Sequence, residues 1–150
     1  MEQTIVLKGI AKARGHASGE ALVSPMNLSW APCSILNDGS IRAYGNPLNG
    51  ENVKGKIIVY PTVTGSTSGS FGMLFKVKQA KTGPTGIICK DVHFIDIAGC
   101  IASDIPAIDS FEVDPVEVIQ SGDWVEIRAD EVGKEGVDHQ MRETFHSALE

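Results

Sequence analysis

A cluster of small hydroxyl residues follows an apolar run near the middle of the chain. In "VYPTVTGSTSGSFGMLFKVKQ", residues 59–79, the stretch from Thr62 to Ser70 holds three serines, three threonines and two glycines. Glycines let a backbone bend sharply and let a ligand approach it closely. Where a strand passes into a helix, the first amides of that helix favour an anion. The pattern therefore favours a cradle for an anionic group, although its composition fits an ordinary loop equally well.

Individual residues in this loop have separable roles. Ser70 has the residue type and position of a helix N-cap, so its hydroxyl would accept a hydrogen bond from the first turn. This leaves Ser66, Thr67 and Ser68 to face a ligand above the end of the strand. The loop lacks the Gly-Lys-Ser/Thr of a P-loop and the G-x-G-x-x-G of a dinucleotide site.

The surrounding sequence predicts the elements that must hold the loop. "KIIVYP", "TGIICK" and "IPAIDS" have the length and continuous apolar character of buried strands. "HFIDIAGCIASD" predicts a short helix, and residues 124–129 predict a closing strand. "TIVLKGIAKARGHASGEALVS" is expected to form two strands joined, as in a hairpin, by a glycine-bearing turn near Gly15 to Gly19. The order predicts an α/β domain over residues 1–130, with a β-rich layer, a mixed sheet and short helices, followed by a charged tail over 131–150 that is expected to be helical in part.

Composition excludes several functional classes. The net charge is −6 with no basic run, which argues against a nucleic-acid partner. No apolar run has the ~20 residues of a membrane span, and nothing resembles a signal peptide, so a cytoplasmic location is expected. Cys89 and Cys100 stand in apolar contexts typical of the core, and Cys33 in a loop-like one. Their spacing predicts neither a disulfide framework nor a metal site.

Four segments together resemble the small, swivelling subunit of aconitase X. They are "GHASGEALVS", "NPLNGENVKGKIIVYPTVTGSTSGSF", "GPTGIICKDVHFIDIAGCIASDIPAID" and "IQSGDWVEIRAD". The likeness runs from about Lys8 to Asp130 with the motifs in the expected order. The resemblance implies a swivelling β/β/α domain that docks over a large catalytic subunit to form a heterodimeric hydro-lyase.

The resemblance also assigns roles within the loop. Ser66 matches the family's catalytic serine, the proton acceptor, and Gly65, Thr67, Ser68, Gly69 and Ser70 complete the substrate-binding loop. An iron or iron–sulfur centre is expected in the large subunit, with none bound by this chain. A serine becomes a usable base only where directed N–H groups or cations stabilise its alkoxide. Since no lysine or arginine lies within the loop, we expect this chain to be inactive alone.

The residue before the loop glycine bears on the substrate. Family members often carry Arg or Lys there, whereas this chain has Thr64. A phosphorylated substrate would benefit from a cation at that point. The sequence therefore favours cis-3-hydroxy-L-proline, dehydrated to Δ1-pyrroline-2-carboxylate, over the family's other substrate, 5-phosphomevalonate. The remaining alternatives are a non-catalytic carboxylate-binding module and a phosphohistidine-type swivel domain. The latter needs a histidine after its hydroxyl-rich turn, and none follows Ser66 to Ser70.

Two further side chains have open roles at this stage. His93 follows a predicted strand and either reaches the site or lies on the surface. Trp30 lies in a segment that the family uses near the subunit junction, so an interface role and local packing are both compatible with it.

Overall fold

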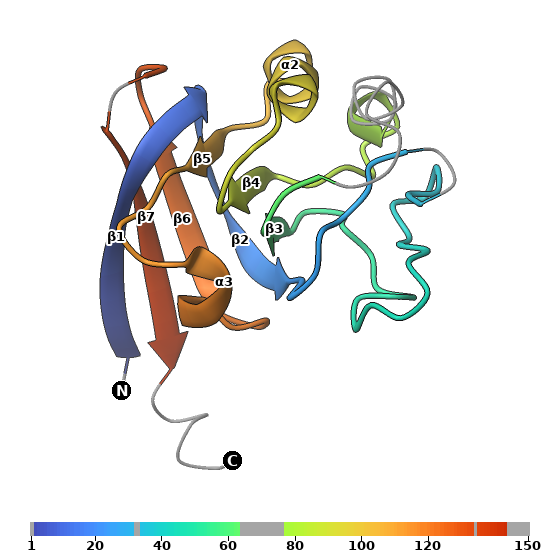
Figure 1. The fold of residues 1–150 in the computed structure, drawn as a ribbon, viewed down its shortest axis with the longest axis horizontal. Coiled ribbons are helices and arrows are strands. Elements are labelled where there is room, and N and C mark those ends of the chain that lie inside the picture. Colours follow the sequence, from blue (N-terminus) through green and yellow to red (C-terminus); the bar gives the residue numbers. More distant parts are fainter. Residues whose placement is uncertain (1, 32–33, 64–76, 134, 144–150) are drawn as a thin grey trace.

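Seven strands close into a single barrel in the computed structural model (Figure 1). The structure describes residues 2–31, 34–63, 77–133 and 135–143. In chain order the elements are β1 (Glu2–Ala13), β2 (Gly15–Val23), β3 (Ile57–Tyr60), β4 (Gly86–Cys89), α2 (Phe94–Ala102), β5 (Ala107–Asp109), α3 (Pro115–Val118), β6 (Trp124–Ala129) and β7 (Glu135–Glu143). Around the barrel the strands follow the order β1-β5-β4-β3-β2-β6-β7, and β1 also pairs with β7.

The sheet is mixed, as the sequence predicts. β2, β3, β4 and β5 run parallel to one another, while the remaining pairs are antiparallel. The apolar runs predicted as strands form β3, β4 and β5, and residues 124–129 form β6. The short helix predicted after residue 92 is α2. The predicted class, a mixed sheet with short helices, is confirmed.

The parallel strands are buried on both faces. Ile57 and Val59 of β3 point into the barrel core, where they join Ile88, Ile108 and Ile127. The alternate residues of the same strands contribute to a second core, which lies between the sheet, α2 and the segment 28–53; its members include Leu28, Trp30, Ile35, Ile58, Tyr60, Ile87 and Cys100. This double burial explains why the strands read as continuous apolar runs rather than alternating ones.

The two strands expected over residues 4–24 are present as β1 and β2, but their pairing and the place of the turn differ from the expectation. β1 and β2 do not pair as a hairpin: β1 pairs with β5 and β7, and β2 pairs with β3 and β6. Gly19, expected in the turn, lies within β2, where an added Cβ would stand 2.7 Å from the carbonyl oxygen of Gly55.

The charged tail predicted over 131–150 contains a strand, and its last residues, 144–150, lie outside the described residues. Residues 135–143 form β7 and not a helix, and they pair with β1 along nine residue positions and with β6. Strand pairing uses backbone groups, so a polar segment can complete a sheet whose two neighbouring edges are already in place. β7 thus removes the open edges of β1 and β6.

Candidate active site

Three parallel strands end at the same edge of the sheet. β3, β4 and β5 finish at Tyr60, Cys89 and Asp109 respectively. In folds built on parallel strands, barrels included, ligands commonly bind beyond the carboxyl ends of those strands. At this edge β3 passes into residues 61–63, which are the last described residues before the serine loop.

The predicted site residues themselves lie outside the described residues. These are Gly65, Ser66, Thr67, Ser68, Gly69 and Ser70, with Thr64 before them. The next described residues after this segment, 77–79, are helical. The assignment of Ser66 stays a prediction, and the described residues before the loop show what holds its start.

The stem of the loop is fixed by backbone hydrogen bonds on both sides. Lys90 N–H donates to the Tyr60 carbonyl at 3.3 Å, and Asp91 N–H donates to the Pro61 carbonyl at 3.0 Å. On the opposite side Leu28 N–H donates to the Thr62 carbonyl at 3.1 Å, and Leu28 forms a parallel bridge with Val63. The chain is therefore held as far as the last described residue before the loop.

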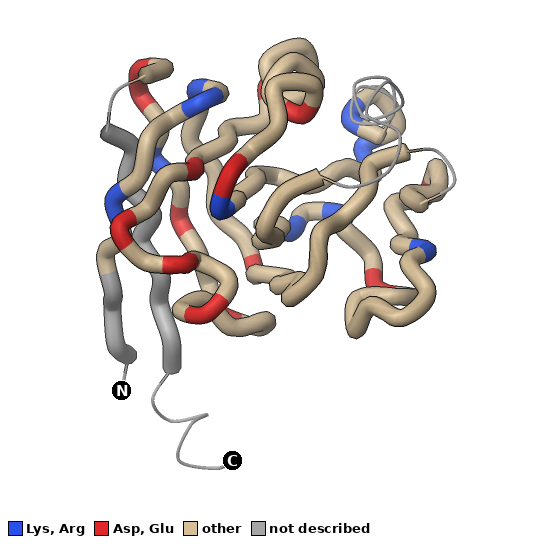
Figure 2. The backbone as a smooth tube through the Cα atoms, in the orientation of Figure 1, with Lys and Arg blue, Asp and Glu red and all other residues tan. Residues whose placement is uncertain are grey.

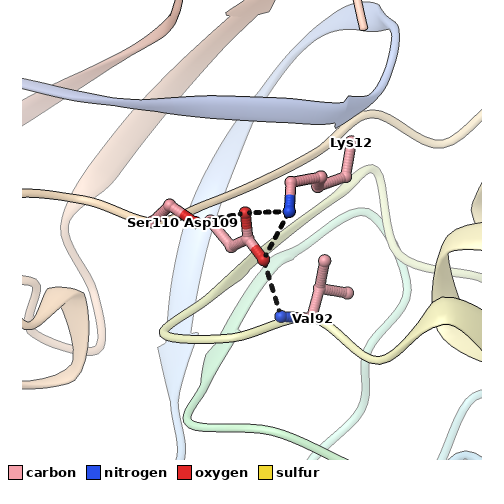
Figure 3. Close-up of polar contacts among 4 residues, drawn as sticks. All are labelled: Lys12, Val92, Asp109 and Ser110. Atoms are coloured by element: carbon pink, nitrogen blue, oxygen red, sulfur yellow. Dashed lines mark hydrogen bonds and ion pairs between the residues drawn. The ribbon is translucent and has the colours of Figure 1, made fainter. Parts of the chain in front are cut away.

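A buried carboxylate organises the neighbouring end of β5 (Figure 3). Asp109 is fully buried and lies 3.1 Å from Nζ of the part-exposed Lys12. Its Oδ2 accepts the Val92 N–H at 2.9 Å, and its Oδ1 accepts the Ser110 hydroxyl at 3.1 Å. Asp109 thus ties β1 and β5 to the segment between β4 and α2.

Ser110, which follows β5 at this edge, has an unusual backbone. Its φ of 58° lies in the left-handed region, which is costly for a residue other than glycine. Its N–H donates to the Lys90 carbonyl at 3.4 Å. Such conformations persist where surrounding contacts enforce them, and they concentrate at functional sites.

His93 caps α2. Its Nδ1 accepts the Ile95 N–H at 3.2 Å, and its ring stacks on Phe94 with centroids 4.3 Å apart. The half-buried imidazole therefore begins the helix. The sequence left open whether His93 reaches the site or lies on the surface. These contacts support a structural role at the surface.

Trp30 belongs to the core. Its side chain is fully buried and its Nε1 donates to the Tyr60 hydroxyl at 2.9 Å. Local packing, and not an exposed interface, is therefore its role. Cys33, from the same segment, lies outside the described residues.

The described cysteines do not suit metal ligation. Cys89 and Cys100 are fully buried, and burial raises the pKa of each thiol above its ordinary value. Metals bind the thiolate, which these sites disfavour. Within the described ranges, no three His, Cys, Asp or Glu side chains gather as a metal site.

Two buried acidic side chains were missed by sequence reasoning. Asp109 ends an apolar strand, and Asp96 interrupts the apolar helix α2 at a core-facing position, one turn before Cys100. A carboxylate inside an otherwise apolar run is a usable signal of buried polar contacts, since such a group is seldom buried without partners.

The charge distribution shows no dominant basic surface. Figure 2 shows lysine and arginine scattered among acidic residues along the described tube. Separately, within the part of the chain that the structure describes, no helix has the length and apolar character needed to cross a bilayer.

Comparison with known families shows the family of the chain. The family model for the aconitase X swivel domain matches residues 6–134, which is most of the chain. The chain belongs to the aconitase X swivel domain family. This confirms the family predicted from the loop and strand motifs, and with it the class of small dehydratase subunits to which its relatives belong.

The curated relatives carry one functional name. The phosphomevalonate dehydratase small subunit of Methanosarcina mazei is 34% identical over 127 residues, covering 85% of this chain and 88% of the relative. That of Thermococcus sibiricus is 35% identical over 124 residues, covering 83% and 92%. These names differ from the hydroxyproline substrate expected from Thr64.

The fold has also been solved in the family. The crystal structure of Thermococcus kodakaraensis aconitase X in its holo-form superimposes with a TM-score of 0.80 at 29% identity, covering 93% of this chain and 99% of that chain. The swivel fold predicted from the sequence is therefore confirmed.

Proposed function

We propose that this chain is the small subunit of a two-chain hydro-lyase and that Ser66 is its proton acceptor. The observation that carries the proposal is the family match over residues 6–134, which includes the serine loop that leaves the carboxyl edge of β3. The remaining loop residues, Gly65, Thr67, Ser68, Gly69 and Ser70, are proposed to bind the substrate.

The chemistry is an elimination of water from a small hydroxy acid. A base removes the proton from the carbon next to the carboxylate, the C–H electron pair forms the double bond, and the hydroxyl on the next carbon leaves with a proton as water. Ser66 is proposed to take the carbon-bound proton. Amides of the loop and of the helix that follows would stabilise the serine oxygen in its basic form.

The acid that receives the hydroxyl is assigned to the partner subunit. Cys89 and Cys100 are buried in the core, and burial raises the pKa of each thiol, so neither cysteine is suited to bind a metal or the substrate. An iron or iron–sulfur centre in the large subunit remains our prediction, as does a cytoplasmic location. This division of the chemistry would leave either chain inactive alone.

The names of the relatives favour 5-phosphomevalonate as the substrate. Its 3-hydroxyl stands next to the carbon that carries the carboxylate, which is the arrangement that the elimination requires. Although Thr64 supplies no cation, Lys90 is exposed immediately after β4 at the same edge and could meet a phosphate. The second candidate is cis-3-hydroxy-L-proline, and the absence of a cation at Thr64 is the observation that favours it.

The exposed face of α2 supports the proposal that a partner subunit docks at this edge. Phe94 and Ile101 are 69% and 57% exposed, and the exposed positions between and after them are Ala98 and Ala102. α2 follows β4 after residues 90–93 and lies above this strand in the view of Figure 1. An apolar helix face beside a site that a second chain must complete suits docking of the large subunit.

The test is reconstitution with the large subunit from the same genome. The purified complex is assayed for loss of water from 5-phosphomevalonate and from cis-3-hydroxy-L-proline at equal concentrations. The proposal expects turnover of the phosphorylated acid by the complex and by neither chain alone. Turnover of hydroxyproline only would reverse the choice of substrate, and a lack of turnover of both would contradict the proposed function.

A further inference from the structure

A chain of buried polar side chains lies beneath the stem of the serine loop. Trp30 Nε1 donates to the Tyr60 hydroxyl at 2.9 Å, and the Tyr60 hydroxyl donates to Asp96 Oδ2 at 2.9 Å. All three side chains are fully buried. The Trp30 and Tyr60 rings also meet edge-on, with centroids 6.2 Å apart.

This polar chain joins three segments that are distant in sequence. Tyr60 is the last residue of β3, Asp96 lies in the first turn of α2, and Trp30 follows the Leu28 bridge to Val63. Its members therefore fix the strand end from which the loop departs, the helix beside it, and the segment that holds the other side of the stem. The first turn of a helix also favours a carboxylate through the helix dipole.

Stability alone gives a weak reason for these residue types. A buried hydroxyl and a buried carboxylate both lose hydration, and an apolar pair such as Phe and Leu fills a similar volume without that cost. Replacing buried polar networks with apolar side chains is often neutral or stabilising. What directed hydrogen bonds add is a defined geometry, here for the aromatic ring that ends β3.

We propose that Tyr60 and Asp96 are positioning residues for the serine loop. The Tyr60–Asp96 hydrogen bond fixes the end of β3 against α2, so that the chain enters the loop in a single direction. This inference rests on the proposed function, because the group being positioned is Ser66. Neither side chain is expected to touch the substrate.

The decisive variant is the double replacement Tyr60→Phe with Asp96→Leu in the reconstituted complex. Because it removes both members of the Tyr60–Asp96 pair, it is expected to fold and to unfold at a temperature no lower than Tyr60→Phe alone, in which Trp30 Nε1 likewise loses its acceptor. A small misplacement of a reacting group costs up to about 100-fold in rate, so we expect kcat to fall by about 10-fold to 100-fold with KM little changed. Tyr44→Phe, at a tyrosine that is 85% exposed, is the matched control and should change neither constant.

A conservative variant separates positioning from folding. Asp96→Asn retains a carbonyl oxygen that can accept from the Tyr60 hydroxyl, so it is expected to restore most of the kcat lost in Asp96→Leu. A purely structural role would instead lower the unfolding temperature of the variants and leave kcat per folded complex unchanged. Wild-type kcat in the folded double variant overturns the inference.

Amide hydrogen exchange tests the inference without an assay of activity. In the isolated full chain, peptides covering residues 61–76 should exchange faster in the double variant than in the wild type, whereas peptides from β6 should not change. Unchanged exchange in both regions overturns the positioning role. An inactive wild-type complex that still shows the exchange difference would contradict the proposed function and leave the positioning role supported.

Discussion

Replacing Asp109 by Asn should destabilise the protein far more than a matched change in an exposed contact. Asp109 is fully buried and accepts hydrogen bonds from Val92 N–H and the Ser110 hydroxyl while pairing with Lys12. Hydrogen bonds to charged groups contribute about 1.5–3 kcal/mol each. Because Asn keeps one acceptor oxygen and the shape of the side chain, we expect a loss of about 3 kcal/mol in the free energy of unfolding.

The corresponding change in melting temperature is large enough to measure easily. For a chain of this size, about 3 kcal/mol lowers the Tm by roughly 9 °C. Urea unfolding followed by circular dichroism gives the free energy directly. The control is Asp130→Asn, which alters the exposed His16–Asp130 contact and should cost less than about 0.5 kcal/mol.

A double-mutant cycle with Lys12→Met tests the ion pair itself. Lys12 is 31% exposed at its side chain, so its removal leaves a buried carboxylate with two remaining donors and with partial access of solvent to the vacated side. We expect about 1–2 kcal/mol for Lys12→Met, and the double variant should cost less than the sum of the two singles by at least about 1 kcal/mol. If Asp109→Asn costs no more than Asp130→Asn, or if the two changes are additive, the account of this buried pair is wrong.

Three other predictions follow from described contacts. Gly9→Ala would place a Cβ 2.5 Å from the backbone oxygen of Asp109, so unfolding experiments should show a loss of about 1–3 kcal/mol, and an unchanged stability would contradict the tight β1–β5 approach. Burial raises the pKa of the Cys100 thiol, so the native state retains a proton that the unfolded state loses above its ordinary thiol pKa; stability should be fully present below about pH 8.5 and fall above it. The free energy of unfolding is measured for the wild type and for Cys100→Ala, each against its own value at pH 7. In the alkaline range the value for Cys100→Ala should fall less steeply, by up to about 1.4 kcal/mol per pH unit. Parallel curves would exclude this thiol as a cause. Phe94→Ser should weaken binding of the large subunit by at least about tenfold in a titration while Trp124→Ser, exposed on β6, should not; equal affinities would remove α2 from the interface.

The sequence predicts the central sheet well because burial on both faces leaves a strong local signal. β3, β4 and β5 each read as a short apolar run, and β6 reads as a strand after a turn. The pairing of β1 could not be predicted in the same way, since its partners β5 and β7 lie about a hundred residues or more away along the chain. β7 could not be predicted as a strand from its sequence, because its pairing uses backbone groups and does not require a particular pattern of side chains.

The sequence predicts a candidate site in the serine loop, but it does not predict the contacts that support the start of that loop. That prediction depends on a run of glycine and hydroxyl residues over 65–70, which follows an apolar strand in the sequence. By contrast, nothing local distinguishes Asp96 or Asp109 from a surface carboxylate except the apolar residues on either side. Their partners, Tyr60 of β3 and Lys12 of β1, come from distant parts of the chain, so only the assembled fold brings these pairs together.

The most direct test of the account is the turnover of the reconstituted complex carrying Ser66→Ala. Gel filtration with the large subunit should show normal assembly, and the rate of water loss from 5-phosphomevalonate should fall by at least about 100-fold, mainly in kcat, because a proton-transfer group contributes about that much. Thr67→Ala, at the adjacent loop position, is the matched control and is expected to raise KM more than it lowers kcat. A Ser66→Ala complex that turns over at the wild-type rate would contradict the assignment of this hydroxyl as the proton acceptor.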